Sequence, residues 1–378
     1  MVAPLLESKR RSAPMNWNRR RFSTFLLVLG VGLAVRLILA WGLYGNYDMS
    51  SYDLVTEILH QGGNVYAETT RYNYSPLWMG VLAITSASAN WLSLPHHAVL
   101  RAFLTCVDLA NAILIALIAG NRQFRLKSFA LYWLNPGVIL IIGYHGQFEC
   151  LALFFLLLAL WTRNTATSVF LGGVAVLVKH IILFNAWVLF VYHLNFRRAI
   201  IASLILGLIF VLSFVPFLPE GAEGVLRNVF LYRASDFGPF QVFGSAVGLS
   251  LFLGLMILAP FVWRRMALNL ATSLALTALL QVTLMPGLGA QYFMLSIALT
   301  SLIPAWWKWT LTLGLFLGLH YLLEMLLAAE LISNQLWYLV QMSLFLPWIF
   351  NGIFLVVVLW SAVRRRQNYL LLANQGLR

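Results

Sequence analysis

Asp48 and Asp53 lie in the first polar stretch of a chain that is otherwise mostly apolar or basic. Residues 45–75 hold four of the twelve acidic residues, including these two. A carboxylate beside a membrane can act as a general base on an acceptor hydroxyl. We predict this catalytic role for Asp48. Loop aspartates are also common turn or cap residues, and Asp53 falls in the first turn of an expected helix, where a negative charge is favourable.

A second polar group, His145, Gln147 and Glu149, crowds one turn between two apolar runs. Such side chains can form hydrogen bonds with sugar hydroxyls or phosphate oxygens. Lys179 and His180 end another apolar run, and a cation there can meet a phosphate. Each has a structural alternative, because a histidine can be a satisfied interface residue and a lysine at a helix end often extends its amine to water.

Two further segments add candidate substrate-binding residues. A glycine-rich stretch at 286–292 ends in Gln291 and Tyr292, and its glycines allow close approach of a ligand to the backbone. Arg71 is the basic residue of the loop that carries Asp48. We expect these groups to meet on one side of the membrane. Polar pairs that only stabilise a helix bundle would not need so many groups on one face.

The elements that must position these residues are membrane helices. Of 378 residues, 61% are hydrophobic and 10% charged, with a mean hydropathy of +0.83, whereas soluble domains carry about 25% charged residues. Repeated apolar runs of roughly 20 residues are typical of transmembrane helices. The net charge of +13 does not indicate nucleic acid binding, because the basic residues are scattered in short loops between apolar runs.

These runs predict an all-α integral membrane protein, a bundle of about 12 helical segments in one domain at 24–363. Basic tails at 1–23 and 364–378 flank this domain. Most lysines and arginines fall in loops that one orientation places inside, so we expect both termini in the cytoplasm and the protein in a plasma (inner) membrane. The outer side then holds the loops at 45–75 and 217–246.

The first outer loop contains a predicted amphipathic helix at 51–60. Its apolar residues recur three and four positions apart, which is typical of a helix on the membrane surface. Ser50 or Ser51 is the expected N-cap. Segment 76–97 is weakly apolar, and we interpret it as re-entrant, partial or part of the outer assembly. The alternative, a full span, would place the basic loop at 121–127 outside.

Ionisable residues inside apolar runs need a partner or a polar cavity. Arg36 is one of them, and we interpret Arg101 and Asp108 as pairing within the bundle. The aromatic cluster Trp306-Trp307-Lys308-Trp309 predicts an interfacial belt. The remaining histidines are interpreted as structural or solvated.

No spacing of histidines, cysteines or carboxylates predicts a metal site. The pair of Asp48 and Asp53 is compatible with a divalent cation but is no more than that. Cys106 and Cys150 both lie in apolar segments, which makes a structural disulfide or a cysteine metal site unfavourable.

Five motifs occur in an order that resembles the GT-C class of polytopic glycosyltransferases, which use sugars carried on a polyprenyl phosphate. The similarity is greatest to enzymes that depend on dolichyl-phosphate-glucose or -mannose and to their bacterial relatives. It covers roughly residues 45–292, with Ser75 where proline is common and Glu149 where aspartate or asparagine is commoner. The motifs are Asp48 after the first run, Tyr72-Asn73-Tyr74-Ser75-Pro76, Leu134-Asn135-Pro136-Gly137 leading to His145-Gly146-Gln147-Phe148-Glu149, Val178-Lys179-His180, and Pro286-Gly287-Leu288-Gly289-Ala290-Gln291-Tyr292.

The resemblance implies an inverting transferase for hexosyl or mannosyl units. The donor would be a polyprenyl-phosphate-linked sugar in the membrane lipid, and the acceptor a hydroxyl of a glycan, lipid or protein. It implies that Asp48 deprotonates this hydroxyl and that Lys179, with Arg71 or Arg233, contacts the donor phosphate. Tyr74 belongs to the implied substrate-binding set.

Two other functions remain open from the sequence. A transporter or flippase of lipid-linked sugars would use the same polar cavity without a base, although the chain shows none of the internal repeats common in transporters. A non-catalytic membrane subunit would need no convergent ionisable residues, so substitutions of Asp48 and Lys179 would have no effect.

Overall fold

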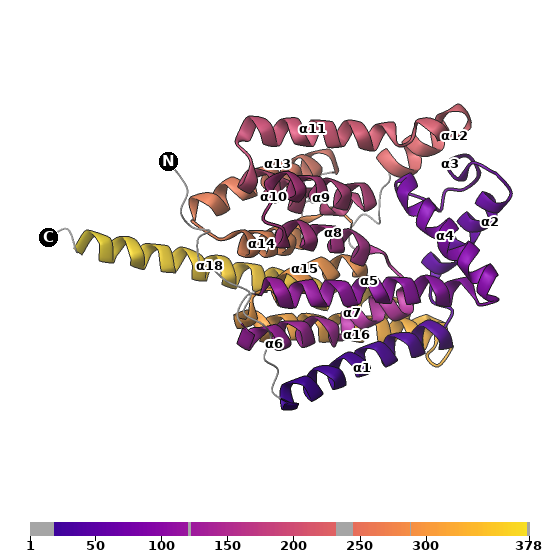
Figure 1. The fold of residues 1–378 in the computed structure, drawn as a ribbon, viewed down its shortest axis with the longest axis horizontal. Helices are drawn as coiled ribbons and strands as arrows, with labels where there is room; N and C mark the ends of the chain where they lie inside the picture. The colour runs from indigo at the N-terminus through magenta and orange to yellow at the C-terminus, as the bar shows by residue number, and fades with distance from the viewer. Residues whose placement is uncertain (1–18, 120–121, 232–244, 288, 376–378) are drawn as a thin grey trace.

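A computed structural model describes residues 19–119, 122–231, 245–287 and 289–375, and in these ranges the chain is helical without any β-strand (Figure 1). The predicted all-α fold is therefore confirmed. Buried apolar side chains from most of the helices join one large core. Many large apolar side chains remain exposed on the outer helices, for example on α11 (Phe196–Leu212), as expected for a protein whose surroundings are lipid.

Within the described ranges, six helical runs are long and apolar enough to cross a membrane. A seventh is possible if the pair of α6 (Arg122–Trp133) and α7 (Pro136–Leu140), bent by 47°, counts as one span. The six runs involve α1 (Arg19–Gly42), α5 (His96–Ile118), α11 continuing into α12 (Leu218–Val225), α13 (Ser245–Arg265), α16 (Trp307–Ala328), and α17 (Trp337–Ser343) with α18 (Phe345–Gln375).

The prediction of about 12 membrane segments is not confirmed, because several apolar runs form short helices. The longest of these short helices has 15 residues, or roughly 23 Å of helix, against a hydrocarbon core of about 30 Å. A count of apolar runs cannot separate such helices from full spans. They are α8 (Glu149–Trp161), α9 (Thr165–Val178), α10 (Leu183–His193), α14 (Leu270–Leu284) and α15 (Phe293–Ser301).

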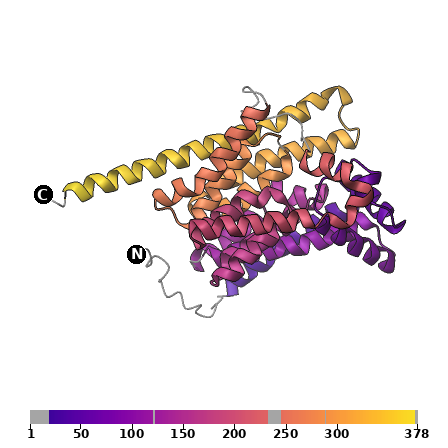
Figure 2. The same cartoon turned by 90° about the horizontal axis from the view of Figure 1, so that it is seen from above.

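The bundle has two different ends. α2 (Tyr47–His60), α3 (Val65–Glu68) and α4 (Pro76–Leu92) lie at one end, which we call the α2 end (Figure 1). α1 begins and α18 terminates at the opposite end, and Figure 2 shows α18 extending past the other helices there. α4, in the segment interpreted as partial or outer, has 17 residues and packs on α2 and α5.

The described part of the second predicted outer loop also lies at the α2 end. α12 contacts α3, and the side-chain amide of Asn64 donates to the carbonyl of Phe217 at 2.9 Å. Asn228 donates in the same way to the carbonyl of Thr69 at 3.1 Å. These bonds join two loops that are far apart in sequence.

Arg36 of α1 and Asp108 of α5 form a fully buried ion pair, with 2.8 Å between Nη2 and Oδ2. The hydroxyl of Tyr132 also donates to Asp108, at 2.5 Å, and Arg36 donates to the carbonyl of Trp133 at 2.8 Å. The predicted need of Arg36 for a partner and the predicted bundle pairing of Asp108 are both confirmed. Arg101 does not share this pair and has another role.

Candidate active site

Asp48 lies in the first turn of α2, which begins one turn before the predicted amphipathic helix. Asn46 is the N-cap, and its Oδ1 accepts the backbone N–H of Asp48 at 3.2 Å. The predicted caps, Ser50 and Ser51, are therefore inside the helix. The prediction placed the start of the helix one turn too late, because the apolar spacing on which it rested begins only at Tyr52. The helix dipole consequently favours the negative charge of Asp48 rather than that of Asp53.

His145 and Gln147 reach the site because α7 does not continue as a regular helix. Ile141–His145 form a π-helical turn, and Gly146 reverses the chain at φ 72°. A Cβ on Gly146 would lie 2.6 Å from Sδ of Met49 in α2. The left-handed conformation therefore favours glycine, and a larger residue would also displace the side chain of Met49.

Arg101 of α5 holds this turn against the end of α1. Its guanidinium donates to the carbonyls of Gly143 at 3.0 Å and Tyr144 at 3.1 Å. It also donates to Ala40 at 2.9 Å and to Leu43. Carbonyls at helix ends lack partners within the helix, and one buried cation satisfies both sets here. Arg101 thereby fixes the position of the residues that precede His145.

Lys179 lies in extended backbone between α9 and the short 3-10 turn His180–Ile182. Ser75 ties this break to the segment before α4, because its hydroxyl donates to the carbonyl of Leu177 at 2.6 Å. Glu149 is the first residue of α8. Nζ of Lys179 lies 2.5 Å from Oε1 of Glu149, and both side chains are buried.

The structure brings five of the predicted site residues into one hydrogen-bonded series. Oδ2 of Asp48 accepts from Nε2 of His145 at 2.7 Å and from the amide nitrogen of Gln147. The amide oxygen of Gln147 accepts from Lys179 at 3.1 Å, and Lys179 donates to Glu149. We call this series the Asp48 row. These two partners allow only one orientation of the Gln147 side-chain amide, because its nitrogen must donate to the carboxylate and its oxygen must accept from the ammonium.

α16 supplies two polar residues to the site that the sequence analysis missed. The hydroxyl of Tyr321 lies 2.7 Å from Nδ1 of His145, and Glu324 accepts from the side-chain amide of Asn46 at 3.1 Å. Both ring nitrogens of His145 therefore have a partner, Asp48 at Nε2 and Tyr321 at Nδ1. Glu324 is a carboxylate in an apolar run, a signal that marks it as a candidate; a tyrosine gives no such signal.

An aromatic wall borders the Asp48 row. The ring of Phe148 stacks on Trp78, with centroids 3.9 Å apart and an interplanar angle of 9°. Tyr74, predicted to bind substrate, meets Phe148 edge-on at 4.8 Å. Nζ of Lys179 lies 4.2 Å from the ring centroid of Phe148 and 5.0 Å from that of Tyr74. The amine of Lys179 therefore lies over two aromatic rings, an arrangement typical of cation–π contacts.

Asp48 is the most solvent-exposed member of the Asp48 row. Its side chain is 29% exposed, against 3% for Lys179 and 4% for Glu149. Burial raises the pKa of Asp48, but the hydrogen bond and charge of His145, the charge of Lys179 and the bond from Gln147 together lower this pKa below its ordinary value. Asp48 is therefore ionised at neutral pH and can accept a proton.

Asp53 and Arg71 do not join the Asp48 row. Oδ1 of Asp53 is 2.8 Å from Nδ1 of His96, and its Oδ2 accepts from the hydroxyl of Tyr44 at 2.6 Å. Arg71 instead binds the first turn of α2. It donates to the carbonyl of Tyr47 at 3.0 Å and to the hydroxyls of Ser50 at 2.5 Å and Ser51 at 3.1 Å.

The remaining predicted residues lie around or beyond the row. His180 is exposed and forms no hydrogen bond with a member of the Asp48 row. Gln291 folds back on its own turn, since a Cβ on Gly289 would lie 2.7 Å from its Oε1. Tyr292 borders a small cavity together with Glu149. Arg233 lies outside the described residues.

No group of three or more His, Cys, Asp or Glu side chains in the described ranges could hold a metal ion. Asp48 and Asp53, the pair compatible with a cation, have different partners, His145 and His96. Cys106 and Cys150 are free thiols.

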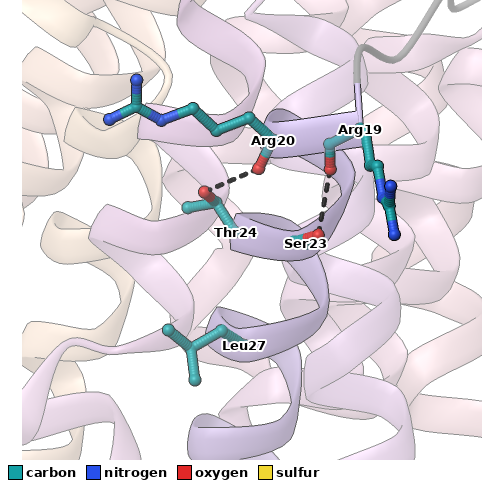
Figure 3. Close-up of a pocket in the computed structure, with 5 residues that line it drawn as sticks. All are labelled: Arg19, Arg20, Ser23, Thr24 and Leu27. Carbon is teal, nitrogen blue, oxygen red and sulfur yellow. Dashed lines mark hydrogen bonds between the residues drawn. The ribbon is translucent and has the colours of Figure 1, made fainter.

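A shallow hollow at the first turns of α1 lies at the opposite end from Asp48. It is lined by Arg19, Arg20, Ser23, Thr24 and Leu27 (Figure 3). The two hydroxyls donate to the carbonyls of the two arginines, each at 3.0 Å. It offers no carboxylate or imidazole for acid–base chemistry, so the Asp48 row is the better candidate for an active site.

No protein-family model matches this chain, and no curated protein is detectably similar to it in sequence.

Proposed function

We propose that the chain is an inverting glycosyltransferase that moves a hexosyl or mannosyl unit from a polyprenyl-phosphate donor to an acceptor hydroxyl on the outer face of the membrane. One observation carries the proposal. An ionised, partly open carboxylate, Asp48, is joined through Gln147 to a buried ammonium, Lys179. A base and a cation at one end of an apolar bundle are what transfer from a lipid-linked phosphate requires.

The geometry of Asp48 supports its role as the base. Both of its side-chain hydrogen bonds, from His145 and Gln147, go to Oδ2. Oδ1 is therefore left for the acceptor hydroxyl. The two fixed donors hold the carboxylate in one orientation, which lowers the entropic cost of aligning it with the acceptor.

The proposed reaction is a single displacement. Oδ1 of Asp48 takes the proton of the acceptor hydroxyl while the acceptor oxygen forms a bond to the anomeric carbon. The bond between this carbon and the phosphate oxygen breaks on the opposite face, and its electron pair leaves with the polyprenyl phosphate. The configuration at the anomeric carbon is thereby inverted.

The leaving phosphate gains negative charge, so electrostatic stabilisation matters more than acid catalysis. Lys179 has three N–H donors, of which two bind Gln147 and Glu149. A donor phosphate would compete with Glu149 for this ammonium. Arg71, held on the turn of α2 that carries Asp48, is the second candidate for contact with the phosphate.

Sugar transfer by the purified protein tests the proposal. The donors are synthetic polyprenyl-phosphate-mannose and -glucose, and the acceptors are a fluorescent octyl glycoside and a membrane lipid extract. Asp48→Asn keeps the size of the side chain but removes the base, so the rate should fall by about 10²- to 10⁴-fold. Glu57→Gln is the matched control, because Glu57 is an exposed carboxylate on the same helix, and this variant should retain most of the activity.

Full activity of Asp48→Asn would contradict the proposed base. Movement of intact donor across proteoliposomes, with no cleavage of the sugar–phosphate bond, would favour a transporter. A non-catalytic subunit would be favoured if the wild-type protein neither transfers the sugar nor moves the donor. In that case Asp48→Asn and Lys179→Ala should also have no effect in cells.

A further inference from the structure

A large pocket lies at the end of the bundle opposite to Asp48. Its lining residues come from the end of α13, the beginning of α14, the beginning of α16 with the turn before it, and α18, which Figure 1 labels. Its volume of about 880 Å³ is within the range of roughly 300–1,000 Å³ that is typical of ligand sites. No residue of the Asp48 row lines it.

One side of the pocket is an aromatic and aliphatic slot. The rings of Trp309 and Phe354 are stacked, with centroids 5.1 Å apart, and Trp306 meets Phe354 edge-on at 5.3 Å. Leu276 and Val358 continue this wall. A slot of this kind fits a hydrocarbon chain and has no feature that would bind a free, fully hydrated ion.

The rim of the pocket is polar and carries one cation. Arg265 is exposed and forms no hydrogen bond or ion pair with another described residue. Its neighbour Arg264 is occupied, since it donates to the carbonyl of Val191 at 2.7 Å. Thr272 and Ser361 also line the pocket, and the hydroxyl of Ser361 donates to the carbonyl of Val357 at 2.7 Å. The guanidinium of Arg265 is a donor suited to a phosphodiester.

Two further cations lie against Trp307, which follows the pocket residue Trp306 in the sequence. Nζ of Lys127 is 4.7 Å from the ring centroid of Trp307, and Nζ of Lys308 is 5.7 Å from it. Trp307 and Lys308 belong to the cluster predicted as an interfacial belt, the level at which lipid headgroups meet tryptophan side chains. The positive charge of Arg265 beside an apolar slot complements a ligand with an anionic head and a hydrocarbon tail.

We propose that this pocket binds one anionic phospholipid, with its phosphate on Arg265 and an acyl chain along Trp306, Trp309 and Phe354. The proposal does not depend on the glycosyltransferase function. A zwitterionic lipid offers the same chain but carries its own cation, so it lacks the net charge that the rim complements.

Native mass spectrometry of the full chain in mild detergent tests the proposal. Phosphatidylglycerol, phosphatidylcholine with the same acyl chains, and inorganic phosphate are titrated separately. We expect phosphatidylglycerol to bind tightest, and Arg265→Ala to weaken its binding by about tenfold, the loss of one charge-assisted contact. Ala362→Phe, which fills the pocket without changing charge, should weaken binding of both lipids.

Arg197→Ala is the control, because Arg197 is an exposed arginine at the same end that does not line the pocket. Its binding of phosphatidylglycerol should equal that of the wild type, and thermal unfolding of each variant identifies any that fails to fold. Equal binding of the two lipids, binding that survives both Arg265→Ala and Ala362→Phe, or binding of inorganic phosphate as tight as that of phosphatidylglycerol would each overturn the proposal.

Discussion

At the scale of residues, the properties of Asp48 depend on His145. The imidazole donates to Asp48 through Nε2, and its other nitrogen is held by Tyr321. A carboxylate with a lowered pKa is a weak base, but it stays ionised over a wide pH range. His145 is thus proposed as a positioning residue that keeps the base charged and aligned.

This role predicts a shift in the pH dependence of activity. Burial raises the pKa of Asp48, and His145 provides the largest opposing effects. In His145→Leu the pKa of Asp48 should rise, because burial is then less opposed. Since the protonated carboxyl cannot act as a base, activity falls as pH drops through this pKa, and the acidic limb of kcat/KM should move to higher pH.

The measurement is kcat/KM for transfer between about pH 4 and 8, around and above the ordinary carboxylate value. Tyr321→Phe retains the imidazole and should move the acidic limb less than His145→Leu does. An acidic limb that stays in place in His145→Leu would remove His145 from this role, even if the rate fell.

At the scale of elements, α2 is fixed by contacts at its first turn and at its middle. Arg71 binds its first turn through the carbonyl of Tyr47. Further along, Asp53 reaches His96 at the beginning of α5 and Tyr44 before α2. Asp53 therefore has a structural part, because it attaches the helix that carries Asp48 to the bundle.

Asp53→Asn should loosen α2 in a pH-dependent way. Burial raises the pKa of Asp53, but hydrogen bonds from His96 and Tyr44 outweigh it and lower this pKa. The stabilisation is hence fully present above the ordinary carboxylate pKa of about 3.9 and is lost as pH falls through the lowered value. Amide hydrogen exchange in α2 should be several-fold faster in the variant at pH 7.

The difference in exchange between the wild type and Asp53→Asn should shrink toward zero as the pH falls below the ordinary pKa of aspartate. Glu57→Gln, a change of the same kind at an exposed position of α2, should leave exchange unchanged. Equal exchange of wild type and Asp53→Asn at pH 7 would show that the contact with His96 does not hold the helix.

At the scale of the whole molecule, several exposed basic residues lie at the end opposite to Asp48. Asp48, Asp53 and Glu149 gather toward the α2 end, while Arg265 and the N-terminal turn of α1 lie at the other. Basic loops remain in the cytoplasm during insertion, so we predict that the α2 end faces outward.

Cysteine labelling tests this orientation. Gln61→Cys, after α2, and Arg197→Cys, at the start of α11, are exposed positions at opposite ends. In a Cys106→Ala background, which removes the exposed native thiol, an impermeant maleimide added to intact cells should label position 61 and not 197. The reverse pattern would mean that the site faces the cytoplasm.

Much of this protein follows from its sequence. The apolar composition requires membrane helices, because a polar backbone in lipid must satisfy its hydrogen bonds internally. Ionisable residues in apolar runs are costly, so Arg36 was recognisable as a residue in need of a partner, and Asp108 as one that pairs within the bundle. The confirmed helical fold and the meeting of Asp48 with His145, Gln147, Glu149 and Lys179 agree with these arguments.

Tertiary structure decided which partners meet and which apolar runs are long enough to cross. Spacing along one segment cannot show that Asp108 pairs with Arg36, that Asp53 turns to His96, or that Tyr321 lies against His145, because these contacts join separate helices. Short buried helices and full spans share one composition, since both are surrounded by apolar groups. Helix length and position in the bundle, rather than hydropathy, distinguish them.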